Sequence, residues 1–168
     1  MRVSNHETWA LIHGIAIGGL FLLGFTGGLV ALWSLRSDLL TTAGVAQQVK
    51  RLRLGTALMA VMAWATVLTG AWIILPWYRA AGGPKAQLMA DPSTRAWHTF
   101  ADVWKTHIAW TAPLLATAAA SLVAYYGAAL ARDRTARSIV LVLFLAAFGV
   151  SSLAGLIGSL VTKAAPVH

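Results

Sequence analysis

Four of the five histidines in this chain lie in two short stretches, each of which opens a long apolar segment. The first stretch holds His6 and His13 beside Trp9, and the second holds His98 and His107 among three tryptophans. Neutral imidazole nitrogen is a ligand for haem iron, copper and zinc. The repeated arrangement therefore predicts a site that binds a cofactor or a metal ion.

The residue types present limit the chemistry of such a site. The chain has no cysteine, which removes disulfides, thiolate metal sites, iron–sulfur clusters and thioether-linked haem. We see no serine-based or carboxylate-pair catalytic arrangement. The acidic residues Glu7, Asp91 and Asp102 are expected to be isolated, and either solvated or capping a helix. These features favour an electron carrier or a subunit of a complex over a stand-alone enzyme.

The composition is typical of an integral membrane protein. Of the 168 residues, 58% are hydrophobic and 11% are charged, and the mean hydropathy is +0.71, outside the usual range of soluble domains. The formal net charge is +8, but the bases are found at segment ends and in loops rather than along one helix face. We therefore expect a single domain, residues 1–168, in contact with the lipid bilayer and not with nucleic acid.

Four apolar segments are long enough to cross a bilayer as helices. Short connections between them place neighbouring helices antiparallel. The predicted fold class is an all-α integral membrane bundle of four antiparallel helices in up-down-up-down order. The predicted spans are about 9–35, 54–77, 104–131 and 138–161, separated by a polar loop at 36–53, a longer connection at 80–96 and a basic turn at 132–137.

The third helix is expected to begin outside the membrane and to bend. An Asp-Pro pair at 91–92 reads as a cap with proline at the first helical position, so about 92–103 is predicted as an extramembrane helix start. His98 and His107 are nine residues apart, which places them on opposite faces of a straight helix. We predict a bend between Trp97 and Pro113, a residue that permits a kink.

Glycines in the first span form two pairs with the same spacing. Gly14 and Gly18, and again Gly24 and Gly28, are four residues apart. Such a pair removes side chains from one helix face. That face allows a second helix to approach closely, or it leaves room for a flat cofactor.

The distribution of bases predicts the orientation in the membrane. The loops at 36–53 and 132–137 carry seven bases in compact clusters, whereas the other side carries six bases that are spread over the N-terminus, the long connection and the tail. Compact basic loops favour the cytoplasmic side. We therefore expect a bacterial inner membrane protein with both termini on the non-cytoplasmic side.

The histidines are predicted to form two tiers. His13 lies 23 residues before the arginine that follows the first span, and His107 lies 25 residues before the arginine that follows the third span. Their levels then differ by roughly 3 Å along the bundle. His6 and His98, at 30 and 34 residues from the same arginines, would lie roughly 10–14 Å further out.

Two imidazoles at one depth, with glycines nearby and bases at the rim, match the needs of a haem b with two histidine ligands. The haem requires axial nitrogens, space for a flat macrocycle, and cations for its propionates. His13 and His107 are the predicted ligands, while His6 and His98 either hold a second haem or line the outer edge. The predicted rim residues are Arg79, Arg95, Lys105 and Lys163.

On these residues the chain resembles the four-helix membrane cytochromes b, in which histidines on separate helices hold haem between them. The resemblance rests on His13 and His107, with His6 and His98 as additions. It implies electron transfer with a membrane redox partner or a quinone. Families with two haems place them toward opposite membrane faces, whereas this chain has no histidine in its cytoplasmic half. One haem, or two stacked near the non-cytoplasmic face, is therefore expected. The chain also looks similar to small bacterial four-span membrane proteins, which implies no function.

Two other functions fit the same sequence. A cofactor-free accessory or assembly subunit would use its glycine faces to pack in an oligomer or a larger complex. A metal-binding protein would use His6, His13, His98 and His107 for copper or zinc. Apart from residues at their ends, the predicted spans carry no charged side chain, so a transporter, a pump or a voltage sensor is not expected.

Overall fold

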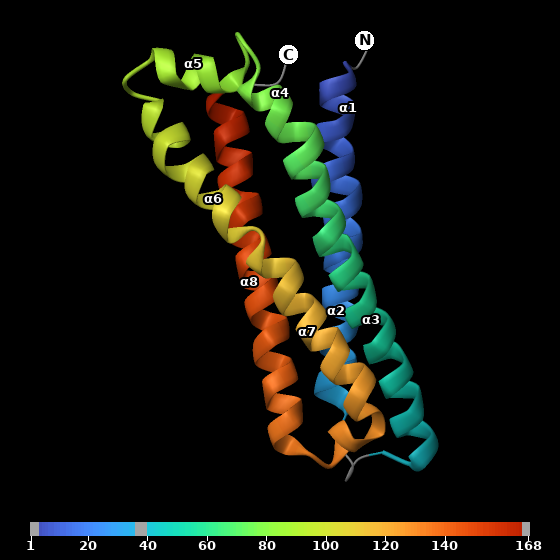
Figure 1. The fold of residues 1–168 in the computed structure, drawn as a ribbon. Helices are drawn as coiled ribbons and strands as arrows, with labels where there is room; N and C mark the ends of the chain where they lie inside the picture. Colours follow the sequence, from blue (N-terminus) through green and yellow to red (C-terminus); the bar gives the residue numbers. More distant parts are fainter. Residues whose placement is uncertain (1–3, 36–39, 166–168) are drawn as a thin grey trace.

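The computed structural model describes residues 4–35 and 40–165, and these residues form an all-α fold. Four long helices are apolar enough to cross a membrane: Asn5–Ser34, Thr42–Arg79, Trp97–Ala131 and Arg134–Ala164. They pack antiparallel, each against its neighbours along the chain (Figure 1). The predicted fold class is therefore confirmed. We call the end of the bundle that holds Ser4 and Ala165 the termini end, and the opposite end the loop end.

Each long helix is a single helix or a series of helical segments joined end to end. In chain order the elements are α1 (Asn5–Leu11), the π-helical η1 (Ile12–Ile17), α2 (Gly18–Ser34), α3 (Thr42–Thr69), the π-helical η2 (Gly70–Ile74), α4 (Leu75–Arg79), α5 (Pro84–Ala90), the π-helical η3 (Trp97–Asp102), α6 (Val103–Ile108), α7 (Thr111–Tyr126), the 3-10 helix η4 (Gly127–Ala131) and α8 (Arg134–Ala164).

The second long helix begins earlier than the sequence predicted. Residues 42–53, which were predicted to be loop, form the first turns of α3. The N-cap residue Thr41 accepts a hydrogen bond from the backbone N–H of Gly44 at 3.2 Å, and the polar residues that follow include the good helix formers Gln, Lys and Arg. The polarity of residues 42–53 therefore marks the part of the helix outside the apolar region, and not a loop before the helix.

The loop half of the bundle is closely packed. Gly24 and Gly28 of α2 lie directly against Gly55 of α3, where an added Cβ would come within 2.6 Å of the backbone nitrogen of Gly28. Small residues at such a crossing let the two backbones approach. Around it, side chains from all four long helices form a core whose most buried members, at most 2% exposed, include Leu32, Leu52, Val123 and Val140.

The two helical hairpins diverge toward the termini end (Figure 1). There α1 and α4 lie on one side and α6 and α8 on the other, with α5 crossing the end of the bundle. The sequence predicted only a connection at 80–96, and α5 lies within it. Leu88 of α5 is 1% exposed and packs in a small core with Tyr78, Ala101 and Val161, so α5 is anchored to both hairpins.

The third long helix begins three residues after Pro92, the predicted first helical position. Asp91 and Pro92 belong to a turn, and helix geometry starts at Arg95. The Oδ1 atom of Asp91 accepts hydrogen bonds from the backbone N–H and the hydroxyl of Ser93, each at 2.8 Å. These bonds, the backbone one above all, lower the pKa of the Asp91 carboxyl.

The third helix is also interrupted where it was expected to bend. Ala109 and Trp110 form a turn between α6 and α7, and Figure 1 shows the change of direction there. Pro113 has no N–H to give to the carbonyl four residues earlier, that of Ala109. The N–H of Ala112 bonds that carbonyl instead, at 3.3 Å. The hydroxyl of Thr111 donates to the carbonyl of Ile108 at 2.7 Å.

Candidate cofactor site at the termini end

The backbone around the histidines departs from α-helical geometry. Within residues 4–35 and 40–165, π-helical turns occur in three places, η1, η2 and η3. His13 lies in η1, His98 lies in η3, and Gly70 at the start of η2 touches His13. Such turns are rare and are frequently found at functional sites. Two of the histidines, His13 and His98, thus lie in π-helical turns, and a third such turn contacts His13.

His13 is hydrogen-bonded to the second long helix. Its Nδ1 lies 2.8 Å from the hydroxyl oxygen of Thr69. That hydroxyl gives its single proton to the carbonyl of Ala65 at 2.7 Å. With the hydroxyl proton on the Ala65 carbonyl, the Thr69 oxygen accepts from His13 and Nδ1 carries the ring proton. In the neutral ring, Nε2 then has a lone pair with which it can bind a metal ion.

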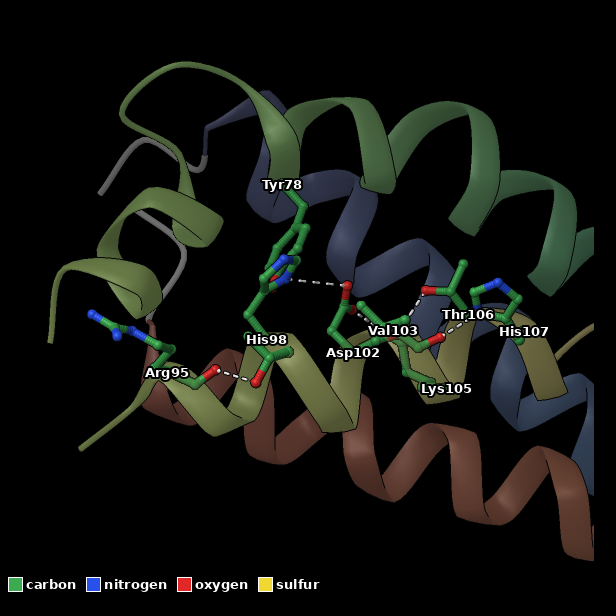
Figure 2. A network of polar contacts seen from close by, with 9 residues as sticks. Tyr78, Arg95, His98, Asp102, Val103, Lys105, Thr106 and His107 are labelled. Carbon is green, nitrogen blue, oxygen red and sulfur yellow. Dashed lines mark hydrogen bonds and ion pairs between the residues drawn. The ribbon is translucent and has the colours of Figure 1, made fainter. Parts of the chain in front are cut away.

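His107 has the same tautomer for a different reason. Its Nδ1 lies 2.7 Å from the carbonyl oxygen of Val103 on the preceding turn of α6. A carbonyl only accepts, so Nδ1 is again the donor and Nε2 keeps its lone pair. The His107 side chain is exposed and points away from α8 in Figure 2. Fixing Nδ1–H in this way is the usual preparation of an imidazole that ligates through Nε2.

The surroundings of His13 leave little room for a larger neighbour. A Cβ on Gly70 would lie 3.3 Å from Cε1 of His13 and 3.9 Å from its Nε2. Gly14 and Gly18, on the same long helix as His13, have nothing within 4 Å of an added Cβ. Gly70 therefore lets the His13 ring pack against η2, whereas Gly14 and Gly18 have open space beside them.

A buried polar cluster surrounds His98 (Figure 2). The hydroxyl of Tyr78, from α4, lies 2.9 Å from Nδ1 of His98. The same nitrogen lies 3.9 Å from Oδ2 of Asp102, whose Oδ1 pairs with Nζ of Lys105 at 3.1 Å. The cluster therefore joins the two hairpins across the termini end.

The expectation that Asp102 is solvated or caps a helix is wrong. Its side chain is buried, with 2% of the residue exposed, and its Oδ2 has no hydrogen-bond partner in the described part of the chain. Asp102 and Ala101 lie four and three residues after His98, and all three side chains of η3 are buried on one face of the helix. The charge of Asp102 is balanced by Lys105 one turn further along.

His6 lies in a different environment. It is exposed in α1, and its ring stacks on Trp77 of α4 with a centroid distance of 5.1 Å and an interplanar angle of 25°. His98, by contrast, is 9% exposed. The two residues predicted for the outer tier are thus held by separate contacts.

The four predicted rim bases differ in what they already bind. Lys105 is paired with Asp102, and a guanidinium nitrogen of Arg95 donates to the carbonyl of Met89 at 3.4 Å. Arg79 and Lys163 are exposed, and neither forms a hydrogen bond or ion pair with another residue in the described ranges. Arg79 and Lys163 are therefore the two bases available to an anionic group.

His13 and His107 share a tautomer, but no contact joins them. In residues 4–35 and 40–165, no hydrogen bond or ring contact links the two imidazoles, and no three His, Asp or Glu side chains lie close enough to hold a metal ion together. Two imidazoles with free Nε2 lone pairs suit the axial positions of haem iron, which needs only two protein ligands. The same two residues are fewer than a structural zinc site requires.

Sequence reasoning missed the partners that orient the histidines. Thr69, Trp77 and Tyr78 lie far from those histidines along the chain, and no local pattern marks them. The Asp102 cluster did leave a signal, because Asp102 is four residues after His98 and three before Lys105, spacings at which helical side chains meet.

No protein family, curated protein or solved structure with which the chain was compared matches it. The functional argument therefore rests on the geometry of its own residues.

Proposed function

We propose that the chain is a membrane-embedded haem b electron carrier, or a redox-complex subunit, whose iron is ligated by His13 and His107. The supporting observation is the shared tautomer. In each ring Nδ1–H is committed to a hydrogen bond, from His13 to Thr69 and from His107 to Val103, and Nε2 is left without one. These residues come from the first and third long helices, which run parallel to each other.

The protein residues would bind and orient the cofactor. Thr69 and the Val103 carbonyl keep each imidazole in its ligating tautomer and raise the basicity of Nε2. Gly14 and Gly18, where an added Cβ would meet nothing within 4 Å, would leave space for a flat ring. Arg79 and Lys163 supply positive charge for the propionates at the rim.

Bound between two imidazoles, haem iron would exchange one electron between its ferrous and ferric states with a membrane redox partner or a quinone. His98 and His6 would line the outer edge, because His98 is occupied by Tyr78 and His6 stacks on Trp77. One haem is therefore the stoichiometry we propose.

We also propose a bacterial inner membrane location with the termini end outside the cytoplasm. The compact bases of the loop end support this orientation. A reporter that works only in the cytoplasm should be active when it is fused after Ala43, and a reporter that works only after export should be inactive there. Activity of an exported-type reporter at that position would reverse the orientation.

The test of ligation is to replace each histidine and measure haem content and spectrum. His13→Ala and His107→Ala should each abolish the low-spin bis-histidine spectrum, because each removes one axial bond. His168→Ala, which alters a residue outside the described ranges, is the control and should keep the spectrum. If the two variants retain the wild-type spectrum, other residues are the ligands. If the wild-type protein expressed with ample haem is colourless, the chain is a cofactor-free accessory subunit.

A further inference from the structure

A groove runs along the surface of the bundle between α2 and α3, in the loop half. Its volume is about 390 Å³. Several of the side chains that line it are apolar and strongly exposed, including Leu23, Val30 and Leu54, which are 60–71% exposed. The groove therefore faces outward. Gly27 lines it, and nothing lies within 4 Å of a Cβ built there.

The chemistry of the walls changes along the groove. Most lining residues are apolar or glycine, and the hydroxyl of Thr26 is already bonded to the carbonyl of Leu22 at 2.7 Å. The other two polar lining residues are Gln48 and Arg51, which lie toward the loop end. The groove is therefore an apolar channel with a cationic end.

Arg51 is placed at the level of lipid headgroups. It is exposed, and the apolar stretch of α3 begins one helical turn later at Leu54. Within the described ranges, neither Arg51 nor Gln48 makes a side-chain hydrogen bond or ion pair. The nearby Arg53 differs, because its guanidinium donates to the carbonyl of Ala124 at 3.3 Å.

We propose that this groove binds an anionic phospholipid, with one acyl chain along Gly27 and the phosphate held by Arg51 and Gln48. Guanidinium and phosphate match in geometry, and basic pockets between membrane helices recognise anionic headgroups. An anionic lipid is favoured over a zwitterionic one, because the cation of a choline headgroup would be repelled by Arg51. This inference is independent of the proposed haem.

The proposal can be tested by native mass spectrometry of the full chain in detergent, with equal amounts of phosphatidylglycerol and phosphatidylcholine. Phosphatidylglycerol should be retained preferentially. Arg51→Gln should weaken that retention about fivefold, the effect expected for one base near an anionic surface. Gly27→Leu should reduce the retention of phosphatidylglycerol by filling the groove without changing the charge.

Two matched variants serve as controls. Lys50→Gln makes the same change of charge outside the groove, and Gly149→Leu adds the same side chain at a glycine of α8 that also has nothing within 4 Å. Both should retain phosphatidylglycerol as the wild type does. Equal retention of the two lipids, or equal losses in Arg51→Gln and Lys50→Gln, would overturn the proposal. So would a dimer that dissociates in Gly27→Leu with lipid retention unchanged, which would make the groove an interface between copies.

Discussion

The first long helix carries two glycine pairs of identical spacing that meet different surroundings. Gly24 and Gly28 lie in the loop half against the backbone of α3, whereas Gly14 and Gly18 lie in the termini half with nothing within 4 Å of an added Cβ. The same pattern thus serves close helix packing in one half and leaves free space in the other. Spacing alone does not distinguish these two uses.

The rest of the molecule follows the same division. Apart from the short 3-10 helix η4, the loop half has α-helices, an apolar core and capped ends, while the termini half has the π-helical turns, the buried Asp102 and the described histidines. Backbone irregularity and buried charge both cost stability. We infer that the loop half stabilises the bundle and the termini half carries the function.

The largest expected effect comes from filling the glycine contact of the loop half. In Gly55→Ala the new Cβ would lie 2.6 Å from the nitrogen and 2.7 Å from Cα of Gly28. Because backbone atoms cannot rotate away, we expect a loss of about 3 kcal/mol in unfolding free energy. Thermal unfolding in detergent, followed by circular dichroism, measures it. Gly18→Ala should leave the melting temperature nearly unchanged, and equal effects of the two variants would erase the distinction between the halves.

A smaller loss is expected at the loop end from Arg137. Its guanidinium donates to the carbonyls of Leu35, Leu130 and Ala131 at 2.9 to 3.1 Å, so it caps the first and third long helices together. Arg137→Met leaves these carbonyls without their partner and should cost about 2 kcal/mol of unfolding free energy. Arg134→Met, at an exposed base, is the control. A melting temperature that is the same for both variants would contradict the capping role.

The architecture could be predicted from the sequence, because four long apolar segments joined by short connections allow few arrangements other than an antiparallel membrane bundle. The sequence was not sufficient for helix ends: the polar segment 42–53 looks like loop although Thr41 caps it as helix. It also missed the burial of Asp102, although this residue is four positions after His98, a spacing at which helical side chains lie on one face. The partners of His13 and His98 lie 56 and 20 residues away, and periodicity carries no information on such distant contacts.

In the termini half, the hydrogen bond of His13 can be removed without changing the shape of the side chain at position 69. Thr69→Val takes away the acceptor of Nδ1–H, and loss of such an orienting partner typically weakens metal binding at least tenfold. We expect haem to dissociate about tenfold more readily, as measured by transfer to apomyoglobin. Thr66→Val is a matched control, because that hydroxyl bonds only its own helix, at the carbonyl of Met62. Identical haem retention in the two variants would remove Thr69 from the site.

The smallest effect is expected at the outer edge. His6→Ala removes a stacking contact with Trp77 between exposed or half-buried rings, which is worth about 0.5 kcal/mol. The spectrum of the haem should persist, with at most a small change of its reduction potential. Disappearance of the low-spin signal in this variant would make His6 a ligand and would move the site outward.

The central claim is tested most directly by the reduced-minus-oxidised optical spectrum of the purified wild-type chain, expressed with ample haem. The proposal predicts the sharp α-band of a low-spin haem b, with one haem per chain by pyridine haemochrome assay. A featureless difference spectrum, or the spectrum of a high-spin haem with only one histidine ligand, would contradict ligation by His13 and His107.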